Sequence, residues 1–335
     1  MKDEPIRILI GRDLEEKHLE LIRSVDPRIE IDIAKDQNDR DKKIRDAEIL
    51  FTHRPKIDVK DAPNLKWIQF MWEGVDHLLM EGYDYPGIIL TNSSGVHSVS
   101  IAEYVFTYIL HITKKVEMYR RYEMQSKWLG WWDQPLVKNL QGSTIGIVGY
   151  GRIGRAIGKI ANGFGMRIIA CKRDPEKRRH TGFEIPGCCD MEGILPERFY
   201  GPGQITEMLP QCDFVVISLP LTEDTIHFMG GREFESMKKD SVLINIGRGR
   251  LVDQEALIAA LKNGEFAGAG LDVFDEEPLP RESPLWTMDN VVVTPHSSTG
   301  GNWETDAVVA LFVENIQRYI HGDDLLNVID KEAGY

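Results

Sequence analysis

The sequence predicts an α/β protein that consists of two doubly wound, parallel-sheet domains, one inserted in the other. Short apolar runs of β type alternate with helical patterns along the chain, which is typical of parallel sheets covered by helices. The 335 residues exceed what one hydrophobic core usually holds. An amphipathic helix over 304–321 is expected to return to the first domain. We therefore expect one domain at 1–104 with 299–335, and the other at 105–298.

The first domain is expected to present two ligand loops at one edge of its sheet. Its strands are predicted at 6–10, 29–34, 47–52, 65–71 and 88–91, with a helix at 14–24. The loops 71–76 and 92–97 follow the last two strands, at the edge where open α/β sheets generally bind ligands. Gly74 and Gly95 would expose backbone N–H groups to a carboxylate, although two ordinary glycine turns would have the same sequence.

A long helix predicted at 98–122 leads from the first domain into the second, and three tryptophans follow it. Trp128, Trp131 and Trp132 lie within five positions of one another. They are expected to form either a dimer contact or a lid over the substrate. The alternative is burial against the neighbouring domain.

The stretch 144–174 has the strand–helix–strand pattern of a dinucleotide site. Its first β run ends in three glycines spaced G-x-G-x-x-G, namely Gly149, Gly151 and Gly154. The first allows a tight turn, the second lets the backbone approach a pyrophosphate, and the third lets helix and strand pack closely. The pyrophosphate would lie at the helix N-terminus, where free N–H groups and the helix dipole favour an anion. An isolated glycine turn is the alternative, and the flanking strands and helix argue against it.

The residues after the second strand of this unit bear on which dinucleotide binds. Lys172 and Arg173 come first, and two cations suit a ribose 2′-phosphate. Asp174 follows and would suit a free 2′-hydroxyl instead. We therefore favour NADP and keep NAD as the alternative. A solvated basic loop is a third interpretation, because further basic residues follow at 177–179.

The remainder of the second domain is expected to continue the parallel sheet. Strands are predicted at 145–148, 167–171, 213–219, 241–246, 266–273 and 291–294, with helices at 153–161 and 253–261. Prolines and glycines interrupt the pattern between residues 178 and 204, which predicts a long loop or inserted excursion. The sequence assigns no function to that segment.

Composition excludes several classes of function. The net charge of −13 argues against non-specific nucleic-acid binding. No apolar run approaches the length of a membrane span, and the N-terminus lacks a signal-peptide core, so we expect a cytoplasmic protein. The four cysteines are expected to be reduced thiols. Cys188 and Cys189 lie near His180, but they lack C-x-x-C spacing, so no metal site is expected.

Three polar residues follow predicted strands of the second domain and form a candidate catalytic set. Arg248, Glu277 and His296 would all lie at the carboxyl edge of the sheet, which faces the ligand cleft. Together they suit hydride transfer to a 2-keto acid, in which the protein orients the substrate and moves one proton. Arginine can pair with the carboxylate and carbonyl oxygens, and histidine can donate the proton. A glutamate beside the ring favours its charged form. Taken singly, each residue also has an ordinary structural explanation.

These motifs together resemble the D-isomer-specific 2-hydroxyacid dehydrogenase family over nearly the whole chain. The matching segments are Gly74-Val75-Asp76, Thr91-Asn92 with Gly95, Ala102-Glu103, 149–154, 218–222, 245–249, Val252-Asp253, 270–274, Glu277-Pro278 and Pro295-His296. The resemblance implies a Rossmann cofactor domain inserted in a flavodoxin-like substrate domain. It also implies homodimers joined through the cofactor domains.

The resemblance implies a role for each site residue. Arg248 would bind the substrate carboxylate and carbonyl, His296 would be the general acid and base, and Glu277 would support His296. The implied substrate-binding residues are Trp72, Glu73, Gly74, Val75 and Trp128. The implied cofactor-binding residues are Gly149, Gly151, Arg152, Ile153, Gly154, Leu219, Pro220, Thr225, Ile246, Gly247 and Asp272, the last at the nicotinamide amide. Lys172 and Arg173 join them on the charge argument given above.

The chain departs from the family pattern at several positions. Lys172 replaces the usual acidic residue, which agrees with NADP, and Glu73 stands where the family often has a small residue. The segment 178–204 looks longer than usual. Lys172 and Arg173, which follow the predicted strand at 167–171, form a basic strand tip. This basic strand tip makes glyoxylate or hydroxypyruvate reductases the nearest subgroup. The alternatives are a dehydrogenase of another anion, such as phosphite or formate, and a nucleotide-sensing corepressor-like protein.

Overall fold

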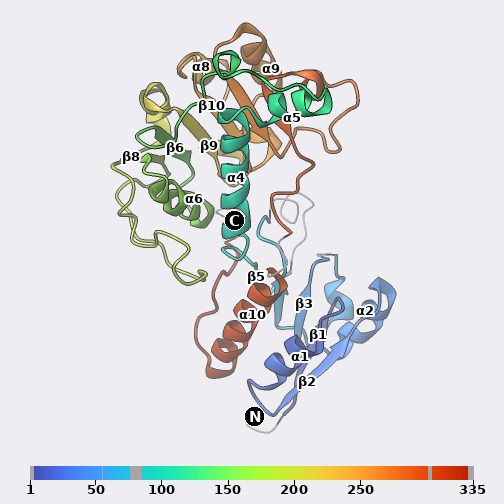
Figure 1. Cartoon of the computed structure of the whole chain (residues 1–335). Helices are drawn as coiled ribbons and strands as arrows, with labels where there is room; N and C mark the ends of the chain where they lie inside the picture. The colour runs from blue at the N-terminus through green and yellow to red at the C-terminus, as the bar shows by residue number, and fades with distance from the viewer. Residues whose placement is uncertain (1–3, 55, 76–84, 301–303, 331–335) are drawn as a thin grey trace. The chain divides into compact units, whose positions relative to one another are not determined.

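The computed structural model describes residues 4–54, 56–75, 85–300 and 304–330, and the chain divides into two compact units (Figure 1). Unit 1 comprises residues 1–97, 182–185 and 301–335. Unit 2 comprises residues 98–181 and 186–300. The second unit is therefore inserted between the two long segments of the first.

Unit 1 is built on a parallel sheet whose described strands run in the order β2-β1-β3-β4-β5. This is the flavodoxin-like order, so the predicted fold of this part is confirmed. Its strands are β1 (Ile6–Ile10), β2 (Ile29–Ile33), β3 (Ile49–Thr52), β4 (Trp67–Phe70) and β5 (Ile89–Thr91). Its helices are α1 (Glu16–Arg23), α2 (Gln37–Lys43) and α10 (Glu304–His321).

Side chains that alternate along the strands give unit 1 a core on each face of its sheet. Ile8 and Phe51 belong to one core, and the adjacent residues Leu9 and Leu50 belong to the other. Helices α1 and α10 cover the first face, where Phe312 of α10 stacks on Phe51 with ring centroids 4.4 Å apart. The closing helix thus completes the core of the unit in which the chain begins.

Unit 2 contains a larger parallel sheet, with its described strands in the order β12-β11-β10-β9-β6-β7-β8. The order reverses between β6 and β9, as in a Rossmann domain, and ligands bind at the carboxyl ends beside such a reversal. Its strands are β6 (Thr144–Val148), β7 (Arg167–Cys171), β8 (Arg198–Tyr200), β9 (Phe214–Ile217), β10 (Val242–Asn245), β11 (Gly268–Leu271) and β12 (Val291–Val293). Its helices are α4 (Ser98–Thr113), α5 (Val116–Met124), α6 (Arg152–Gly163), α7 (Ile205–Met208), α8 (Gly231–Glu235) and α9 (Gln254–Asn263).

Two predictions about elements were wrong. The helix expected over 98–122 is broken, because Lys115 adopts a left-handed backbone conformation (φ 56°) between α4 and α5. The segment 178–204 contains a strand, β8, which extends the sheet beside β7. Prediction from the spacing of apolar residues misses both features. The helix break depends on the backbone angle of one residue, and β8 has only three residues.

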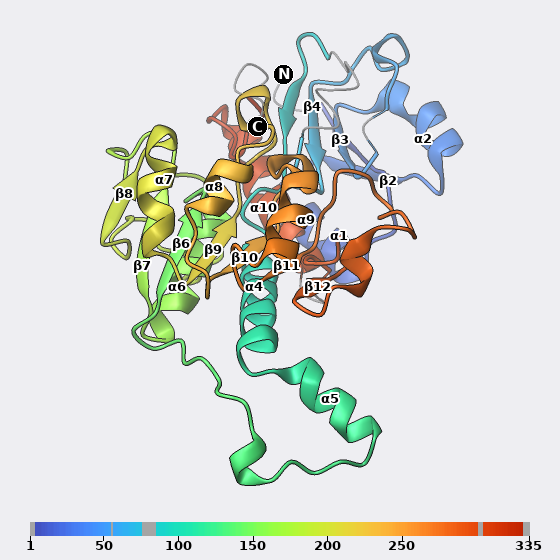
Figure 2. The same cartoon turned by 90° about the horizontal axis from the view of Figure 1, so that it is seen from above.

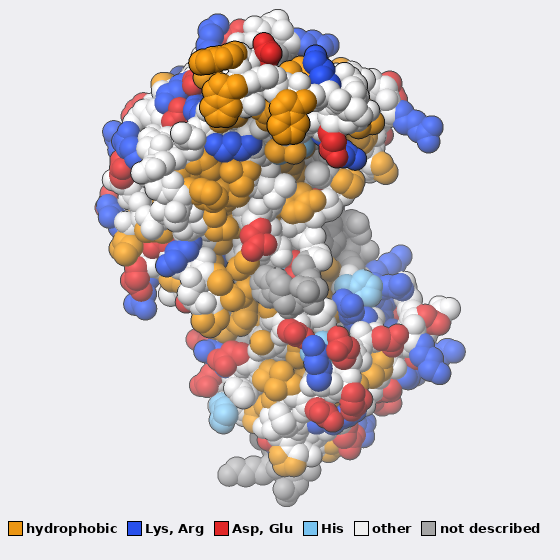
Figure 3. Space-filling model, in the orientation of Figure 1, with side chains coloured by type: hydrophobic (Ala, Val, Ile, Leu, Met, Phe, Trp, Pro, Cys, Tyr) orange, Lys and Arg blue, Asp and Glu red, His pale blue; other side chains and the backbone are white. Residues whose placement is uncertain are grey.

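Helix α5 and the chain after it form an arm that projects from the remainder of unit 2 (Figure 2). The side chains of Trp128, Trp131 and Trp132 are 94%, 78% and 93% exposed. Hydrophobic side chains gather on the surface at this end of the unit (Figure 3). The structure therefore contradicts one of the expected alternatives, in which the tryptophans are buried against a neighbouring domain.

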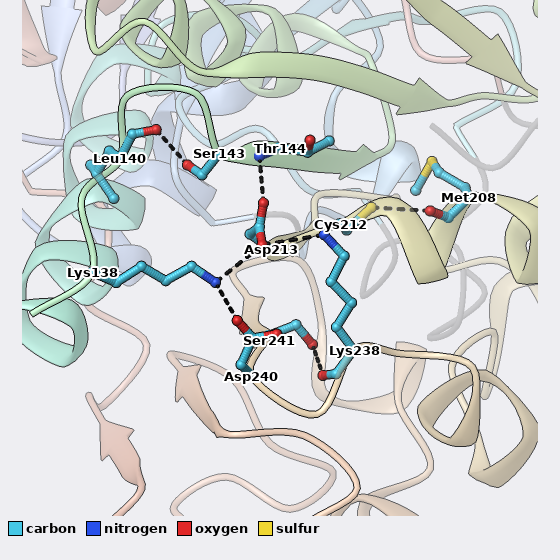
Figure 4. Close-up of polar contacts among 10 residues, drawn as sticks. All are labelled: Lys138, Leu140, Ser143, Thr144, Met208, Cys212, Asp213, Lys238, Asp240 and Ser241. Carbon is cyan, nitrogen blue, oxygen red and sulfur yellow. Dashed lines mark hydrogen bonds and ion pairs between the residues drawn. The ribbon is translucent and has the colours of Figure 1, made fainter. Parts of the chain in front are cut away.

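A polar network ties the arm to the amino edge of the unit 2 sheet (Figure 4). Asp213 accepts the N–H of Thr144 at 2.8 Å and pairs with Lys138 and Lys238 at 3.1 and 3.2 Å. Burial by itself raises the pKa of Asp213, but the Thr144 N–H and the two lysines outweigh it and hold the pKa below its ordinary value. The ionised carboxylate thus stabilises the point where β6 and β9 begin.

No helix in the described ranges is both long enough and apolar enough to span a membrane.

We expect Asp213→Asn to lower the free energy of unfolding by about 1–2 kcal/mol at neutral pH, because a charge-assisted network is lost. Since the folded-state pKa is lowered, this difference should be present above the ordinary carboxyl pKa of 3.8 and vanish as the pH falls through the lowered value. Urea unfolding of both proteins across acidic pH measures it. Equal stability at neutral pH would show that the network contributes nothing.

Candidate active site

A buried carboxylate at the end of β11 fixes the loop that follows β12. Asp272 is fully buried, and its oxygens accept hydrogen bonds from the Thr294 hydroxyl and from the N–H groups of Ser297 and Ser298, both at 2.9 Å. Its carbonyl accepts the N–H of His296 at 2.8 Å. The loop is held tightly enough to keep His296 in a left-handed conformation, with φ at 51°.

His296 and Glu277 form a direct pair. The Nδ1 atom of His296 lies 2.7 Å from Oε2 of Glu277, and the other carboxylate oxygen accepts the N–H of Phe274 at 3.0 Å. The second ring nitrogen of His296 makes no hydrogen bond to any described residue. A carboxylate on Nδ1 orients the ring, which leaves Nε2 to exchange a proton with a ligand.

Arg248 lies on the loop after β10, which packs against the segment that carries Glu277. The side-chain amide of Asn245 donates to the carbonyl of Arg248, and its oxygen accepts the N–H of Gly247 at 3.1 Å. A Cβ atom at Gly249 would lie only 1.9 Å from the backbone of Phe274, so only glycine allows this approach. The structure thus joins Glu277 and His296 directly, and positions the Arg248 loop beside the Glu277 segment.

The three candidate catalytic residues therefore follow three adjacent strands, β10, β11 and β12, at one edge of the sheet. Such a set can bind an anion through the guanidinium and move a proton through the imidazole. This is chemistry suited to the reduction of a keto group.

The glycine loop fits a dinucleotide. Gly149 has φ of 102°, and a Cβ atom there would lie 2.6 Å from the carbonyl oxygen of Ser218. A Cβ atom at Gly154 would lie 2.2 Å from the carbonyl oxygen of Gly149, whereas at Gly151 it would meet no atom within 4 Å. Gly149 and Gly154 are therefore needed for internal packing. Gly151 instead leaves open space at the N-terminus of α6, where a pyrophosphate would be held.

Arg152 and Ile153 begin α6 and are both half-buried. The side chain of Arg152 donates to the carbonyl of Thr181 at 3.4 Å, while Ile153 packs against the core on the α4 side of the sheet. Arg152 thus ties the first turn of α6 to the segment at Thr181, and Ile153 ties it to the core.

The basic strand tip is organised by the excursion that follows it. Lys172 is half-buried and donates its ammonium to the carbonyl of Lys177, and Arg173 is exposed. Burial, and next the charge of Arg155, lower the pKa of Lys172. The Asp174 carboxylate accepts the N–H groups at 176 and 177, so it caps a turn.

Arg155 holds this excursion to α6. Its guanidinium is fully buried and donates to the carbonyls of Arg178, Asp190 and Met191. His180 lies beside it, and burial together with the surrounding cations lowers the pKa of that ring to about 3. The long excursion that the sequence left without a function thus packs against the basic strand tip.

The remaining predicted cofactor residues lie on two loops of unit 2. Leu219, Pro220 and Thr225 follow β9, and the Thr225 hydroxyl bridges the Pro220 carbonyl and the Thr222 N–H, both at 2.8 Å. Ile246 is 5% exposed and, with Gly247, follows β10.

The predicted substrate loop belongs to unit 1. The Trp72 indole donates to the carbonyl of His53 at 2.9 Å, and the Glu73 carboxylate accepts the hydroxyl of Ser94 at 2.8 Å. Gly74 is half-buried and Val75 is 2% exposed. Asp76, which the motif comparison included, lies outside the described residues.

Several residues that position the candidate site were not predicted from the sequence. Asn245 shapes the Arg248 loop, and Thr294 links Asp272 to the Tyr108 hydroxyl on α4. Burial raises the pKa of Tyr108, so its hydroxyl stays neutral. An asparagine two residues before a glycine at a strand end was a usable pattern, whereas the Tyr108 contact joins positions 186 residues apart.

Three comparisons relate the chain to known proteins. The family model described as "D-isomer specific 2-hydroxyacid dehydrogenase, NAD binding domain" matches residues 106–298. A glyoxylate reductase of Korarchaeum cryptofilum is 31% identical, over 98% of this chain and 96% of that protein.

Two crystal structures are similar over almost the whole chain. A D-isomer specific 2-hydroxyacid dehydrogenase family protein from Aeromonas salmonicida has a TM-score of 0.82 at 31% identity, covering 97% of this chain and 99% of that one. A D-isomer specific 2-hydroxyacid dehydrogenase from Xanthobacter autotrophicus, in complex with NADPH and MES, has a TM-score of 0.80 at 26% identity, covering 99% and 100%.

The last two glycines of the loop, Gly151 and Gly154, should behave differently when replaced. Gly151→Ala should fold like the wild type, because its Cβ meets open space, but should weaken NADPH binding at least about tenfold. Gly154→Ala should lower the free energy of unfolding by about 1–3 kcal/mol, because its Cβ collides with the backbone of Gly149. Thermal unfolding and NADPH titration separate the two effects. A Gly151→Ala protein that binds NADPH normally would contradict this assignment of the loop.

Proposed function

The chain belongs to the D-isomer specific 2-hydroxyacid dehydrogenase family, whose members are oxidoreductases that act on CH–OH donors, and from this premise we propose that it reduces a small 2-keto acid to the D-2-hydroxy acid with NADPH. The observation that carries the proposal is the 2.7 Å contact between His296 and Glu277 at the carboxyl edge of the unit 2 sheet.

His296 is the general acid in this reaction. Its Nε2 donates a proton to the carbonyl oxygen as the keto group is reduced, and Glu277 on Nδ1 orients the ring for this transfer. Arg248 binds the substrate carboxylate and the carbonyl oxygen through its two-pronged guanidinium. A nicotinamide cofactor bound at the glycine loop supplies the hydride. In the reverse direction, His296 accepts the proton from the hydroxyl group.

We assign unit 1 as the substrate domain and unit 2 as the cofactor domain. Gly74 and Val75 offer backbone N–H groups to the substrate carboxylate, while Trp72 and Glu73 set the size and charge of the pocket. The substrate class is a short keto acid such as glyoxylate or hydroxypyruvate. The similarity to a glyoxylate reductase over nearly the full length of both chains supports this choice.

The NADPH preference rests on the strand tip after β7. Lys172 and Arg173 are the first side chains beyond the strand, and a 2′-phosphate suits two cations. Asp174, which would favour NADH, already caps a turn with its carboxylate. The Xanthobacter relative in complex with NADPH lends further support. Asp272 lies at the end of β11, where the nicotinamide amide would be bound.

We further propose that the protein is a homodimer joined through unit 2. The arm, residues 116–138, carries several exposed large apolar side chains, which a second copy of the chain would cover. They are Val116, Tyr119, Met124, Trp128, Trp131, Trp132, Leu136 and Val137. Trp128 belongs to this arm, so its place beside a substrate depends on how the arm packs in the dimer.

The wild type should oxidise NADPH with glyoxylate, hydroxypyruvate or pyruvate, and His296→Asn should lower kcat about 10²–10⁴-fold, because the proton donor is lost. NADPH binding should be unchanged, since the glycine loop is intact. His321→Asn, on the exposed end of α10, is the matched control. Absorbance of the reduced nicotinamide measures turnover. Unchanged turnover in His296→Asn would remove this residue from the mechanism.

A double variant of the strand tip tests the cofactor preference. Lys172→Ala with Arg173→Ala should weaken NADPH binding at least about tenfold and NADH binding less than about twofold, because only NADPH carries the 2′-phosphate. Lys159→Ala with Lys262→Ala removes the same charge from exposed positions of unit 2 and serves as control. An equal effect on both cofactors would overturn the 2′-phosphate assignment.

Replacing Trp131 and Trp132 with serine should shift the protein from dimer to monomer, because the arm loses its largest exposed apolar side chains. Sedimentation over a range of protein concentrations measures the change. Trp286→Ser, 51% exposed and outside the arm, is the control. A wild type that sediments as a monomer would refute the proposed dimer.

A further inference from the structure

The loop that follows β4 contains the proposed substrate-binding residues, and the loop that follows β5 holds it in place. The side-chain amide of Asn92 donates to the carbonyl of Glu73 at 2.8 Å, and the hydroxyl of Ser94 donates to one oxygen of the Glu73 carboxylate at 2.8 Å. The N–H of Ser93 donates to the carbonyl of Trp72 at 2.9 Å. The backbone and the side chain of Glu73 are therefore both fixed by the neighbouring loop.

His97 ends the second of these loops and lies between two carboxylates. Its side chain is 12% exposed, and that of Glu304, at the start of α10, is 13% exposed. The Nδ1 atom of His97 lies 3.3 Å from Oε2 of Glu304, and the charge of Glu73 and the carbonyl of Met71 also act on the ring. Within the part of the chain that the structure describes, the loop after β4 and helix α10 thus each present a negative charge to this ring.

One oxygen of the Glu73 carboxylate lacks a donor. Its Oε2 atom is buried and accepts no hydrogen bond from the described residues. A buried carboxylate of this kind is costly unless a positive charge lies nearby. Burial by itself lowers the pKa of His97, but the Glu304 carboxylate, the charge of Glu73 and the Met71 carbonyl outweigh it and hold the pKa above its ordinary value of 6.5. The charged ring is therefore the cation that this carboxylate needs.

The pair of His97 and Glu304 stands where the chain leaves and re-enters unit 1. The chain passes into unit 2 directly after His97 and returns at residue 301, shortly before Glu304. Helix α10 is itself fixed on the sheet, since Phe312 stacks on Phe51 of β3. Through His97, the substrate-binding loop is thus linked to a helix that the unit 1 core holds in place.

We propose that His97, in its charged form, is a positioning residue that holds the substrate-binding loop against α10. This inference rests on the proposed function, in which the N–H groups of Gly74 and Val75 on that loop bind the substrate carboxylate. A charged ring attracts Glu73 and offsets its negative charge beside an anionic substrate. A neutral ring leaves Glu73 and Glu304 to repel each other, so the loop loosens as the pH rises through the raised pKa of His97.

Hydrogen exchange of the full chain tests the proposal without substrate or cofactor. At pH about 6, where the ring is charged, the backbone amides at 72–75 should exchange at least about fivefold faster in His97→Gln than in the wild type. The two proteins should become alike above the raised pKa of His97, because the wild-type ring is then neutral. His321→Gln, on the exposed end of α10, is the matched control. Equal exchange by the wild type and His97→Gln at pH about 6 would overturn the proposal.

Glu304→Gln tests the charge of the ring in a protein that keeps the histidine. It should lower the pKa of His97 in nuclear magnetic resonance titrations, because a carboxylate that raises this pKa is lost. Asp306→Asn removes the same charge from an exposed side chain in the same turn of α10 and should leave the pKa of His97 unchanged. An unchanged pKa in Glu304→Gln would contradict the role of the ion pair.

Kinetics then relate the loop to the substrate. At pH about 6, His97→Gln should have an at least about fivefold higher KM for hydroxypyruvate, while kcat and the KM for NADPH change less than about twofold, because His296 and the glycine loop are intact. The hydroxypyruvate KM should begin to rise at lower pH in Glu304→Gln than in the wild type, and titration of His296, which both proteins share, does not produce that difference. An unchanged hydroxypyruvate KM in His97→Gln would overturn the positioning role. Absence of turnover with every keto acid would count against the proposed function, whereas the exchange measurement would still decide whether His97 orders the loop.

Discussion

The buried carboxylate of Asp272 is the interaction on which the candidate active site depends. Burying a charged group costs free energy unless hydrogen bonds replace those it made to water. The Asp272 carboxylate accepts three hydrogen bonds, all from the loop that follows β12. Those bonds, with the one from the His296 N–H to the Asp272 carbonyl, leave the loop little freedom. His296 is therefore held where Glu277 can reach its ring.

The same principle organises the cofactor side of unit 2. Arg155 is a fully buried cation in α6, and three backbone carbonyls of the excursion surround its guanidinium. Because the bonds run from a rigid helix to an irregular segment, they order that segment against the basic strand tip. The part of the excursion that precedes β8 is thus held against the strand tip although it contains no helix or strand.

Unit 1 uses charge differently, at a surface cavity. Three of its cations follow neighbouring strands, namely Arg12, Lys35 and Arg54. The fourth, Arg40, is buried in α2 and donates to internal acceptors. The contact between His53 and Trp72 joins this cavity to the proposed substrate loop.

The sequence by itself determined the two parallel sheets, the glycine loop and the three strand ends that carry Arg248, Glu277 and His296. Alternation of apolar residues, helical spacing and glycine spacing are local patterns, and the edge of a parallel sheet follows from them. Tertiary structure decided the rest. The break at Lys115 depends on one backbone angle, β8 has too few residues for a period, and the Asp272 and Arg155 networks join positions far apart in the chain. Contacts of that kind exist only once the sheets have formed, because no local pattern encodes which distant donors will face a buried charge.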